Sequence, residues 1–325
     1  MKEIIITQNE AGQRLDKFLR KYLKETSLGS IYKAIRKKDI KVNNLKSNEK
    51  YVLVEGDILQ FYFKIEEETK KKEDKKILEK IVDVNYDFDI AFEDSSIIVA
   101  KKVKGLLTHP DEGDELTLTD QVLAYLFDNG KYDPEKEKTF SPSPCNRLDK
   151  NTEGLVIFAK TYEALKGVNE AIREGNVKKY YMALICNKPR EGRHIAHIQK
   201  DRRANKSRIY DGPVKDSKEI ITDVTIIDTV GQFSQVEIDL ITGKSHQIRA
   251  HLAHMGCPLI GDFKYGDKKV NSFFQNKYGV EDQMLVAYKI IFENCPEGIK
   301  HLEGKTVLMQ VPHYFKKIKK DIFKF

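Results

Sequence analysis

The chain has 325 residues, of which 40% are hydrophobic and 33% are charged, and its formal net charge at pH 7 is +7. This length accommodates one large domain with a small one beside it, or two ordinary domains, and the composition can bury a sizeable core. The excess of Lys and Arg favours a polyanionic partner only slightly, because many enzymes that bind no nucleic acid are equally basic.

The cysteines and the N-terminal residues indicate the cellular compartment. Four scattered cysteines without any C-x-x-C pair are typical of reduced thiols, and they form neither a zinc ribbon nor a disulfide framework. Only three consecutive apolar residues occur near the N-terminus before polar ones, so we predict no signal peptide and no membrane-spanning helix. We therefore expect a cytoplasmic protein that has no membrane partner and acts as a monomer.

The first sixty residues or so predict a small α+β unit. Apolar residues recur at helical spacing between Leu15 and Leu23. A second predicted helix carries Ile31 and Ile35 on one face, and we interpret Ser30 as its N-cap. Short strands are predicted at residues 4–6, 40–42, 51–54 and 58–63, with a turn at 55–57.

Basic side chains recur on both predicted helices of this unit, whereas acidic ones are few. A charge run is usually only a solvated face, but its presence on two packed helices favours a phosphate-binding surface. The candidate RNA-binding residues are Arg14, Lys17, Lys33, Arg36, Lys37 and Lys38. Three segments, GQRLDKFLRKYL, SIYKAIRKKDIKVN and VLVEGDIL, resemble the S4 RNA-binding module, which implies an RNA partner but no particular reaction.

A charged stretch separates this unit from the rest of the chain. No apolar residue occurs between Ile65 and Ile77, so the stretch cannot bury a face. The sequence therefore predicts an S4-like RNA-binding domain at 1–63, a charged linker at 64–80 and a larger domain at 81–325.

The larger domain predicts strands and helices that alternate irregularly. Helices are expected at 118–127, capped by Thr117, and at 247–254. Few segments look like repeated βαβ units, so we predict an α+β domain built on antiparallel sheet. The expected strands lie at residues 89–92, 97–101, 155–159, 180–185 and 236–240.

Two possible sites in this domain fail on their spacing. Gly243-Lys244-Ser245 is similar to the end of a phosphate-binding P-loop, but Ile238 stands where the first glycine of that loop is needed. The histidines of this region lack Cys, Asp or Glu close enough in sequence to complete a set of metal ligands. We therefore predict no metal site and no cofactor.

Asp149 lies in the polar segment NRLDKNTEG, directly before an apolar predicted strand. By its spacing alone, Asp149 could be a turn residue that accepts hydrogen bonds from nearby backbone. The segment PCNRLDKNTEGLVIFAK resembles the signature of the RluA-type RNA pseudouridine synthases. FEDSSIIVAKKVKGLLTHP, KKYYMALI, LITGKSHQIRAHLAHMGCPLIGDFKYGD and VLMQVP continue the resemblance in family order, from residue 81 to about 315.

The resemblance implies roles for four residues. Asp149 would be the catalytic aspartate, and Arg249 would pair with it. Arg147 would help to extrude the uridine and fill the space that it leaves, as an RNA-binding residue. Tyr181 would line the site and take the C5 proton. The chain departs from the family pattern at Asn146, Val103 and Glu153, where the family usually has His, Pro and Ser or Thr.

The resemblance also implies a fold and a function. Residues 81–325 would form a pseudouridine synthase catalytic domain, with a mixed, mainly antiparallel sheet and a central cleft. The protein would isomerise specific uridines to pseudouridine by base flipping, with large-subunit (23S) rRNA or its assembly precursor as the expected substrate. Two alternatives stay open, namely a tRNA pseudouridine synthase of the same family and a non-catalytic ribosome- or RNA-binding protein.

Overall fold

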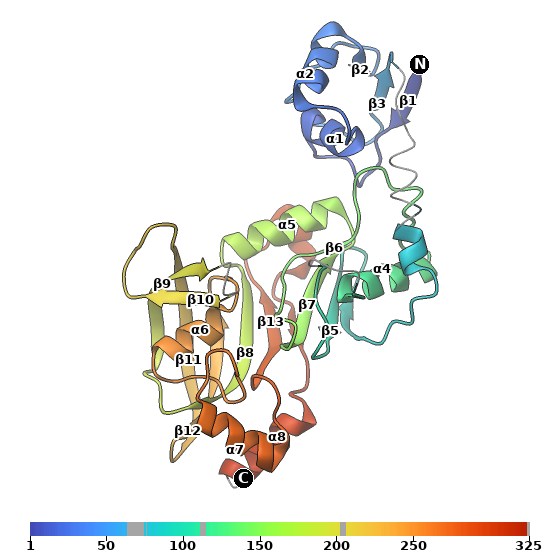
Figure 1. Cartoon of the computed structure of the whole chain (residues 1–325). Helices are drawn as coiled ribbons and strands as arrows, with labels where there is room; N and C mark the ends of the chain where they lie inside the picture. Colours follow the sequence, from blue (N-terminus) through green and yellow to red (C-terminus); the bar gives the residue numbers. More distant parts are fainter. Residues whose placement is uncertain (64–74, 76, 111–114, 202–205, 324–325) are drawn as a thin grey trace.

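The computed structural model describes residues 1–63, 75, 77–110, 115–201 and 206–323. Within these residues the chain forms a three-stranded sheet and an eleven-stranded sheet. The N-terminal unit stands at one end of the molecule, apart from the large sheet (Figure 1). Residues 64–74 and 76 of the predicted linker lie outside the described residues, and residues 77–81 at its end are helical.

The small sheet and two helices make up the N-terminal unit. Its antiparallel strands have the order β1-β3-β2, and α1 and α2 pack on them around a core that includes Phe18, Ile31 and Phe61. The elements are β1 (Lys2–Ile5), α1 (Leu15–Tyr22), α2 (Leu28–Lys37), β2 (Ile40–Val42) and β3 (Ile58–Phe61).

Two predictions for this unit are wrong in detail. Helix α2 begins three residues earlier than expected, because the Ser27 side chain accepts a hydrogen bond from the backbone N–H of Ser30 and so acts as the N-cap. Residues 51–54 form no strand and make only an isolated bridge between Val52 and Arg14. Their backbone groups pair instead with the segment that enters α1, where Leu53 O accepts from Gly12 N.

The large sheet confirms the predicted mixed, mainly antiparallel architecture. Its main strand order is β10-β9-β11-β12-β8-β13-β7-β5-β4, and only β7 and β13 pair in parallel among the described strands. The strands are β4 (Asp89–Glu93), β5 (Ile97–Lys102), β6 (Ser143–Pro144), β7 (Glu153–Ala159), β8 (Val177–Cys186), β9 (Gly192–Asp201), β10 (Lys206–Tyr210), β11 (Lys218–Val230), β12 (Phe233–Leu240), β13 (Leu285–Phe292) and β14 (Thr306–Leu308).

Both faces of this sheet are buried at its central strand β7. Along β7, Leu155 and Ile157 enter one apolar core while Val156 and Phe158 enter the other, which explains the unbroken apolar run. One core takes residues from α4 (Leu118–Asp128) and α6 (Gln247–His254). The other takes residues from α5 (Tyr162–Arg173), α7 (Lys268–Tyr278), η1 (Glu297–Leu302) and α8 (His313–Phe323).

Gly154 permits the parallel contact between β7 and β13. Its φ is +142°, and a Cβ at this position would lie 2.3 Å from the carbonyl oxygen of Ala287. Only glycine can let the two backbones approach so closely. This contact fixes the start of β7, which is the point where the loop carrying Asp149 enters the sheet.

No helix in the part of the chain that the structure describes is both long and apolar enough to span a membrane.

Candidate active site

Asp149 lies on the loop between β6 and β7, and the backbone of this loop is held from three sides. The Thr108 hydroxyl bonds both the N–H and the carbonyl of Leu148, at 3.2 Å each. The Thr152 N–H donates to the Asp149 carbonyl at 3.0 Å. The Lys102 ammonium donates to the Lys150 carbonyl at 2.8 Å. These hydrogen bonds fix the backbone on both sides of Asp149 and do not involve its side chain, which lines the cleft.

Lys102 is a fully buried cation at the root of this loop. Besides Lys150, its ammonium reaches the carbonyl oxygens of Val103 at 2.9 Å and Leu106 at 2.7 Å. Burial lowers the pKa of Lys102 to about 8, and the negative charges of Asp149 and Glu153 oppose that shift. Lys102 therefore joins the segment 103–106 to the loop that carries Asp149.

The Asp149 carboxylate pairs with Arg249 of α6. Arg249 Nη1 lies 3.0 Å from Asp149 Oδ2, while Nε and Nη2 of the same guanidinium contact the two oxygens of Asp262 at 2.7 and 3.0 Å. Burial lowers the pKa of Arg249, but Asp262 and then Asp149 outweigh burial and raise it above its usual value. One permanent cation thus joins two carboxylates in a fixed geometry.

Tyr181 comes from the middle of β8, and its side chain is 5% exposed. It lines the same cleft as Asp149 and Arg249. Burial raises the pKa of the Tyr181 phenol, and the nearby charge of Asp149 raises it further. The phenol is therefore protonated at neutral pH and could exchange a proton only with a group held against it.

The cleft around Asp149 is large and strongly cationic. Its volume is about 1380 Å³. The only carboxylates among its lining residues are Asp149 and Glu115, whereas eight basic side chains line it. A cleft lined by one sign of charge concentrates ligands of the opposite sign, so this one suits a polyanion. The basic residues are Arg147, Lys150, Arg173, Lys179, Lys200, Lys206, Lys244 and Arg249.

The structure brings together four residues that the sequence suggested, namely Asp149, Tyr181, Arg249 and Arg147. Arg147 is exposed at the cleft and lies two residues before Asp149 on the same loop. The other candidates belong to the N-terminal unit and do not line this cleft. They are Arg14, Lys17, Lys33, Arg36, Lys37 and Lys38.

Sequence reasoning missed the residues behind Arg249. Asp262 is fully buried, and it also accepts hydrogen bonds from the backbone N–H groups of Lys264 and Tyr265. The Tyr265 ring lies 5.4 Å from the Arg249 guanidinium, and its hydroxyl lies 2.9 Å from Nδ1 of His246. The segment GDFKYGD, which contains Asp262 and Tyr265, could have indicated them. It belongs to the family resemblance, but no role was assigned to its residues.

Among the described residues, no group of three or more His, Cys, Asp and Glu side chains is arranged to hold a metal ion. His251 is buried, and its Nδ1 lies 3.1 Å from the hydroxyl of Thr222 on β11. Burial lowers the pKa of His251 to about 4, and His194 and His254 add to the shift. This histidine packs helix α6 against the sheet.

Residues 96–254 match the protein family described as RNA pseudouridylate synthase. A Mycoplasma capricolum protein named an uncharacterized RNA pseudouridine synthase is 30% identical, and the match covers 95% of this chain and 97% of that protein. A Rickettsia bellii protein named ribosomal large subunit pseudouridine synthase C is 30% identical, with 97% of this chain and 100% of that protein covered.

The fold has a matching solved structure. Human RNA pseudouridylate synthase domain containing 4 superimposes with a TM-score of 0.57 at 22% identity, covering 78% of this chain and 97% of that protein. Since the relatives match at 30% identity over nearly the whole chain, the protein belongs to the RluA-type family of RNA pseudouridine synthases and is an enzyme that forms pseudouridine in RNA.

Proposed function

We propose that this enzyme converts specific uridines of large-subunit (23S) rRNA, or of its assembly precursor, to pseudouridine, with Asp149 as the essential catalytic group. The observation that carries the assignment is the contact between Asp149 and Arg249 beside Tyr181 in a cationic cleft. Relatives from Rickettsia bellii and Buchnera aphidicola bear the name ribosomal large subunit pseudouridine synthase C, which supports the choice of RNA.

The reaction is an isomerisation that needs no net addition of atoms. The N1–C1′ bond of the uridine breaks, the uracil turns, and C5 joins C1′. The proton on C5 is then lost, and N1 gains one. Asp149 either attacks C1′ or removes a proton from the sugar, and both roles need an ionised carboxylate. The guanidinium of Arg249 holds this carboxylate in place, with Arg249 Nη1 3.0 Å from Asp149 Oδ2.

Tyr181 and Arg147 act on the base in this scheme. The uridine must leave the helical stack before Asp149 can reach it, at a cost of a few kcal/mol. The exposed guanidinium of Arg147 can stack on the bases that the uridine leaves behind and recover part of that cost. The buried Tyr181 phenol would mediate the final transfer of the C5 proton.

The N-terminal unit would supply additional affinity for rRNA. Lys17, Lys33, Arg36, Lys37 and Lys38 are exposed on it, whereas the Arg14 guanidinium pairs with Asp16 at 2.8 Å. Exposed cations gain affinity by releasing the counterions that surround RNA phosphates. We infer that this unit, resembling an S4 module, binds rRNA for an enzyme that acts as a monomer in the cytoplasm.

Replacing Asp149 by Asn tests the catalytic assignment. The amide keeps the shape of the carboxylate but can neither attack C1′ nor act as a base, so tritium release from C5-labelled uridine in rRNA should be undetectable. Binding to rRNA should stay near the wild-type value or tighten slightly, because a carboxylate repels phosphates. Equal losses in kcat and kcat/KM would be the signature of a group that acts only in the transition state.

Two results would contradict the assignment. Substantial turnover by Asp149→Asn would remove Asp149 from the chemistry, and an unfolded variant would make it a structural turn residue. Pseudouridine mapping on total RNA from a deletion strain decides the substrate. A missing modification in 23S rRNA supports the proposal, and a missing modification in tRNA alone supports the alternative within the family.

A further inference from the structure

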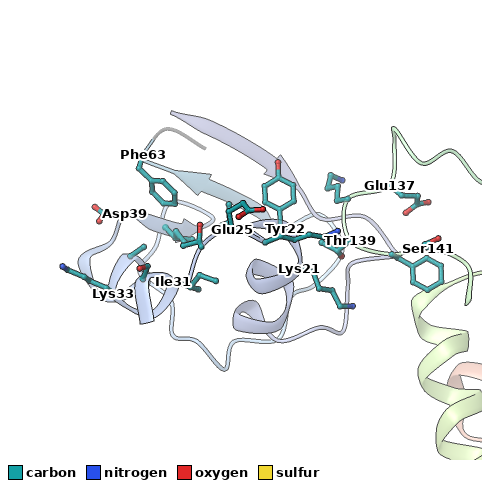
Figure 2. A pocket seen from close by; sticks show the side chains of 18 of the residues that line it. Lys21, Tyr22, Glu25, Ile31, Lys33, Asp39, Phe63, Glu137, Thr139 and Ser141 are labelled. Atoms are coloured by element: carbon teal, nitrogen blue, oxygen red, sulfur yellow. The ribbon is translucent and has the colours of Figure 1, made fainter. Parts of the chain in front are cut away.

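A second hollow lies between helices α1 and α2 of the N-terminal unit and residues 132–141, the segment that leads into β6. We call it the junction groove. Its volume is about 770 Å³, and it shares no lining residue with the cleft of Asp149. Figure 2 shows Lys33 and Phe63 on the N-terminal side and Thr139 and Ser141 on the other side.

The N-terminal unit and the segment 132–141, which together form the junction groove, contact each other directly. Asn9 Nδ2 donates to Glu137 Oε1 at 2.9 Å, and Lys138 Nζ lies 3.6 Å from an oxygen of the buried Glu10 carboxylate. Asn9 and Glu10 belong to the N-terminal unit, whereas Glu137 and Lys138 precede β6. These polar contacts fix the position of the N-terminal unit relative to the segment 132–141. Both parts of the chain therefore determine the shape of the groove.

Two lysines on the rim of this groove have no partner of opposite charge within the part of the chain that the structure describes. Lys33 and Lys37 are one turn apart on α2, both are exposed, and neither makes a hydrogen bond or ion pair with another described residue. Like charges at this spacing repel each other, and an anion placed between them removes the repulsion. The whole lining contains five lysines (Lys21, Lys24, Lys33, Lys37 and Lys138) against three carboxylates (Glu25, Asp39 and Glu137).

The groove also offers surface for a flat ring. Tyr22, Ala34 and Phe63 line it and are half-buried. The Tyr22 ring stacks on Phe18 with centroids 5.7 Å apart, which holds it in place. An unpaired RNA base has an exposed face that stacks on aromatic side chains while lysines meet its phosphates. A fully paired helix hides those faces and cannot enter.

We propose that the junction groove binds an unpaired nucleotide of the RNA substrate, at a distance along the RNA from the uridine that is isomerised. This inference rests on the proposed function, because it takes the substrate to be rRNA. The segment 132–141 continues through β6 into the loop that carries Asp149. A nucleotide held there would therefore set the register of the RNA relative to the catalytic loop.

Paired charge removals test the site. The double variant Lys33→Gln/Lys37→Gln should bind protein-free large-subunit rRNA about tenfold more weakly in filter binding. The matched control Lys46→Gln/Lys50→Gln removes the same charge from exposed positions of the same unit, but it changes no residue that lines the groove and none of the candidate RNA-binding residues. It should lose less than about threefold, because only a general electrostatic contribution is removed. Equal losses in the two double variants would overturn the proposal.

A photo-crosslink provides a second test that depends on neither variant. Thr139→Cys, labelled with an azide photo-crosslinker, places the probe on the wall that precedes β6. Adducts at unpaired nucleotides of the rRNA support the proposal, and adducts only in paired regions, or none, overturn it. Failure of the proposed function looks different, since the wild-type protein would then form no pseudouridine in this rRNA. If the groove alone is wrong, wild-type isomerisation continues.

Discussion

Asp262 orients the guanidinium of Arg249 towards the loop that carries Asp149. Its carboxylate takes two of the three nitrogens of the guanidinium, and only Nη1 is left for Asp149. The Asp262 carboxylate is itself held in place, because the backbone N–H groups of Lys264 and Tyr265 donate hydrogen bonds to it. Asp262 is thus a positioning residue that touches no reacting atom in the proposed mechanism.

Asp262→Asn should lower kcat while leaving rRNA affinity unchanged. The amide group would face a guanidinium N–H, so Arg249 would lose its fixed orientation and Asp149 its partner. A misplacement of about 1 Å can reduce the rate about 100-fold. Steady-state tritium release and filter binding, measured on protein shown to be folded by circular dichroism, separate kcat from affinity.

Asp223→Asn is the matched control for this substitution. Asp223 binds Nε and Nη2 of Arg193 at 2.9 and 2.8 Å, so the pair has the same two-pronged geometry on an exposed part of the sheet. An exposed ion pair contributes at most about 1 kcal/mol, and this one is outside the cleft, so kcat should stay near the wild-type value. A kcat of Asp262→Asn that matches this control would contradict the positioning role.

At the residue scale, the sequence indicated the residues that are proposed to carry the chemistry, but not the residues that hold them in place. The NRLDKNTEG segment and its resemblance pointed to Asp149, and the structure places Arg249 and Tyr181 beside it. Asp262 is thirteen residues from Arg249 and contributes through a contact that only the fold creates. Lys102 has no sequence signal for burial, because a lysine in a strand is usually solvated.

Helix α6 depends on a histidine as well as on its apolar residues. His251 is buried against Thr222, and its pKa is lowered to about 4 from the usual 6.5. The unfolded chain therefore binds a proton between these two pH values that the folded chain does not. Stability linked to His251 is fully present above pH 6.5 and is lost as the pH falls towards 4.

His251→Gln should flatten this pH dependence. The loss in the wild-type protein amounts to about 3 kcal/mol between pH 6.5 and 4, and glutamine does not titrate in that range. Glutamine can still hydrogen-bond Thr222, so the variant should remain folded at neutral pH. Urea unfolding at several pH values gives the free energy of unfolding of each protein. Parallel curves for the two proteins would show that another group is responsible.

At the element scale, local patterns were reliable where one interaction determines the structure. Thr117 caps α4 with a full capping box, as its position predicted. Ser30 was predicted as the N-cap of α2, but Ser27, which carries the same hydroxyl group three residues earlier, caps the helix instead. The strand predicted at 51–54 failed because its backbone partners lie in the turn before α1 and not in the sheet. The parallel pairing of β7 with β13 joins segments far apart in sequence, so no local pattern could indicate it.

The whole molecule has separate apolar cores for its two parts. The core of the N-terminal unit is built only from residues between Ile4 and Phe63, and the two cores of the large sheet contain none of them. The contacts across the junction, such as Asn9 with Glu137, are polar. Each part should therefore fold without the other, because buried apolar area provides most of the stability of a domain.

Deleting residues 1–63 should separate affinity for rRNA from catalysis. The truncated protein should stay folded, since the cores around the large sheet remain complete. Its rRNA affinity should fall, and the slope of log Kobs against log[salt] should become shallower by about 0.9 for each lost phosphate contact. At saturating RNA, kcat should stay near the wild-type value, because Asp149, Arg249 and Tyr181 all lie in the remaining part. Filter binding across a salt series and tritium release measure the two properties on one preparation. Unchanged affinity and salt slope would mean that the basic faces of α1 and α2 are only solvated surface.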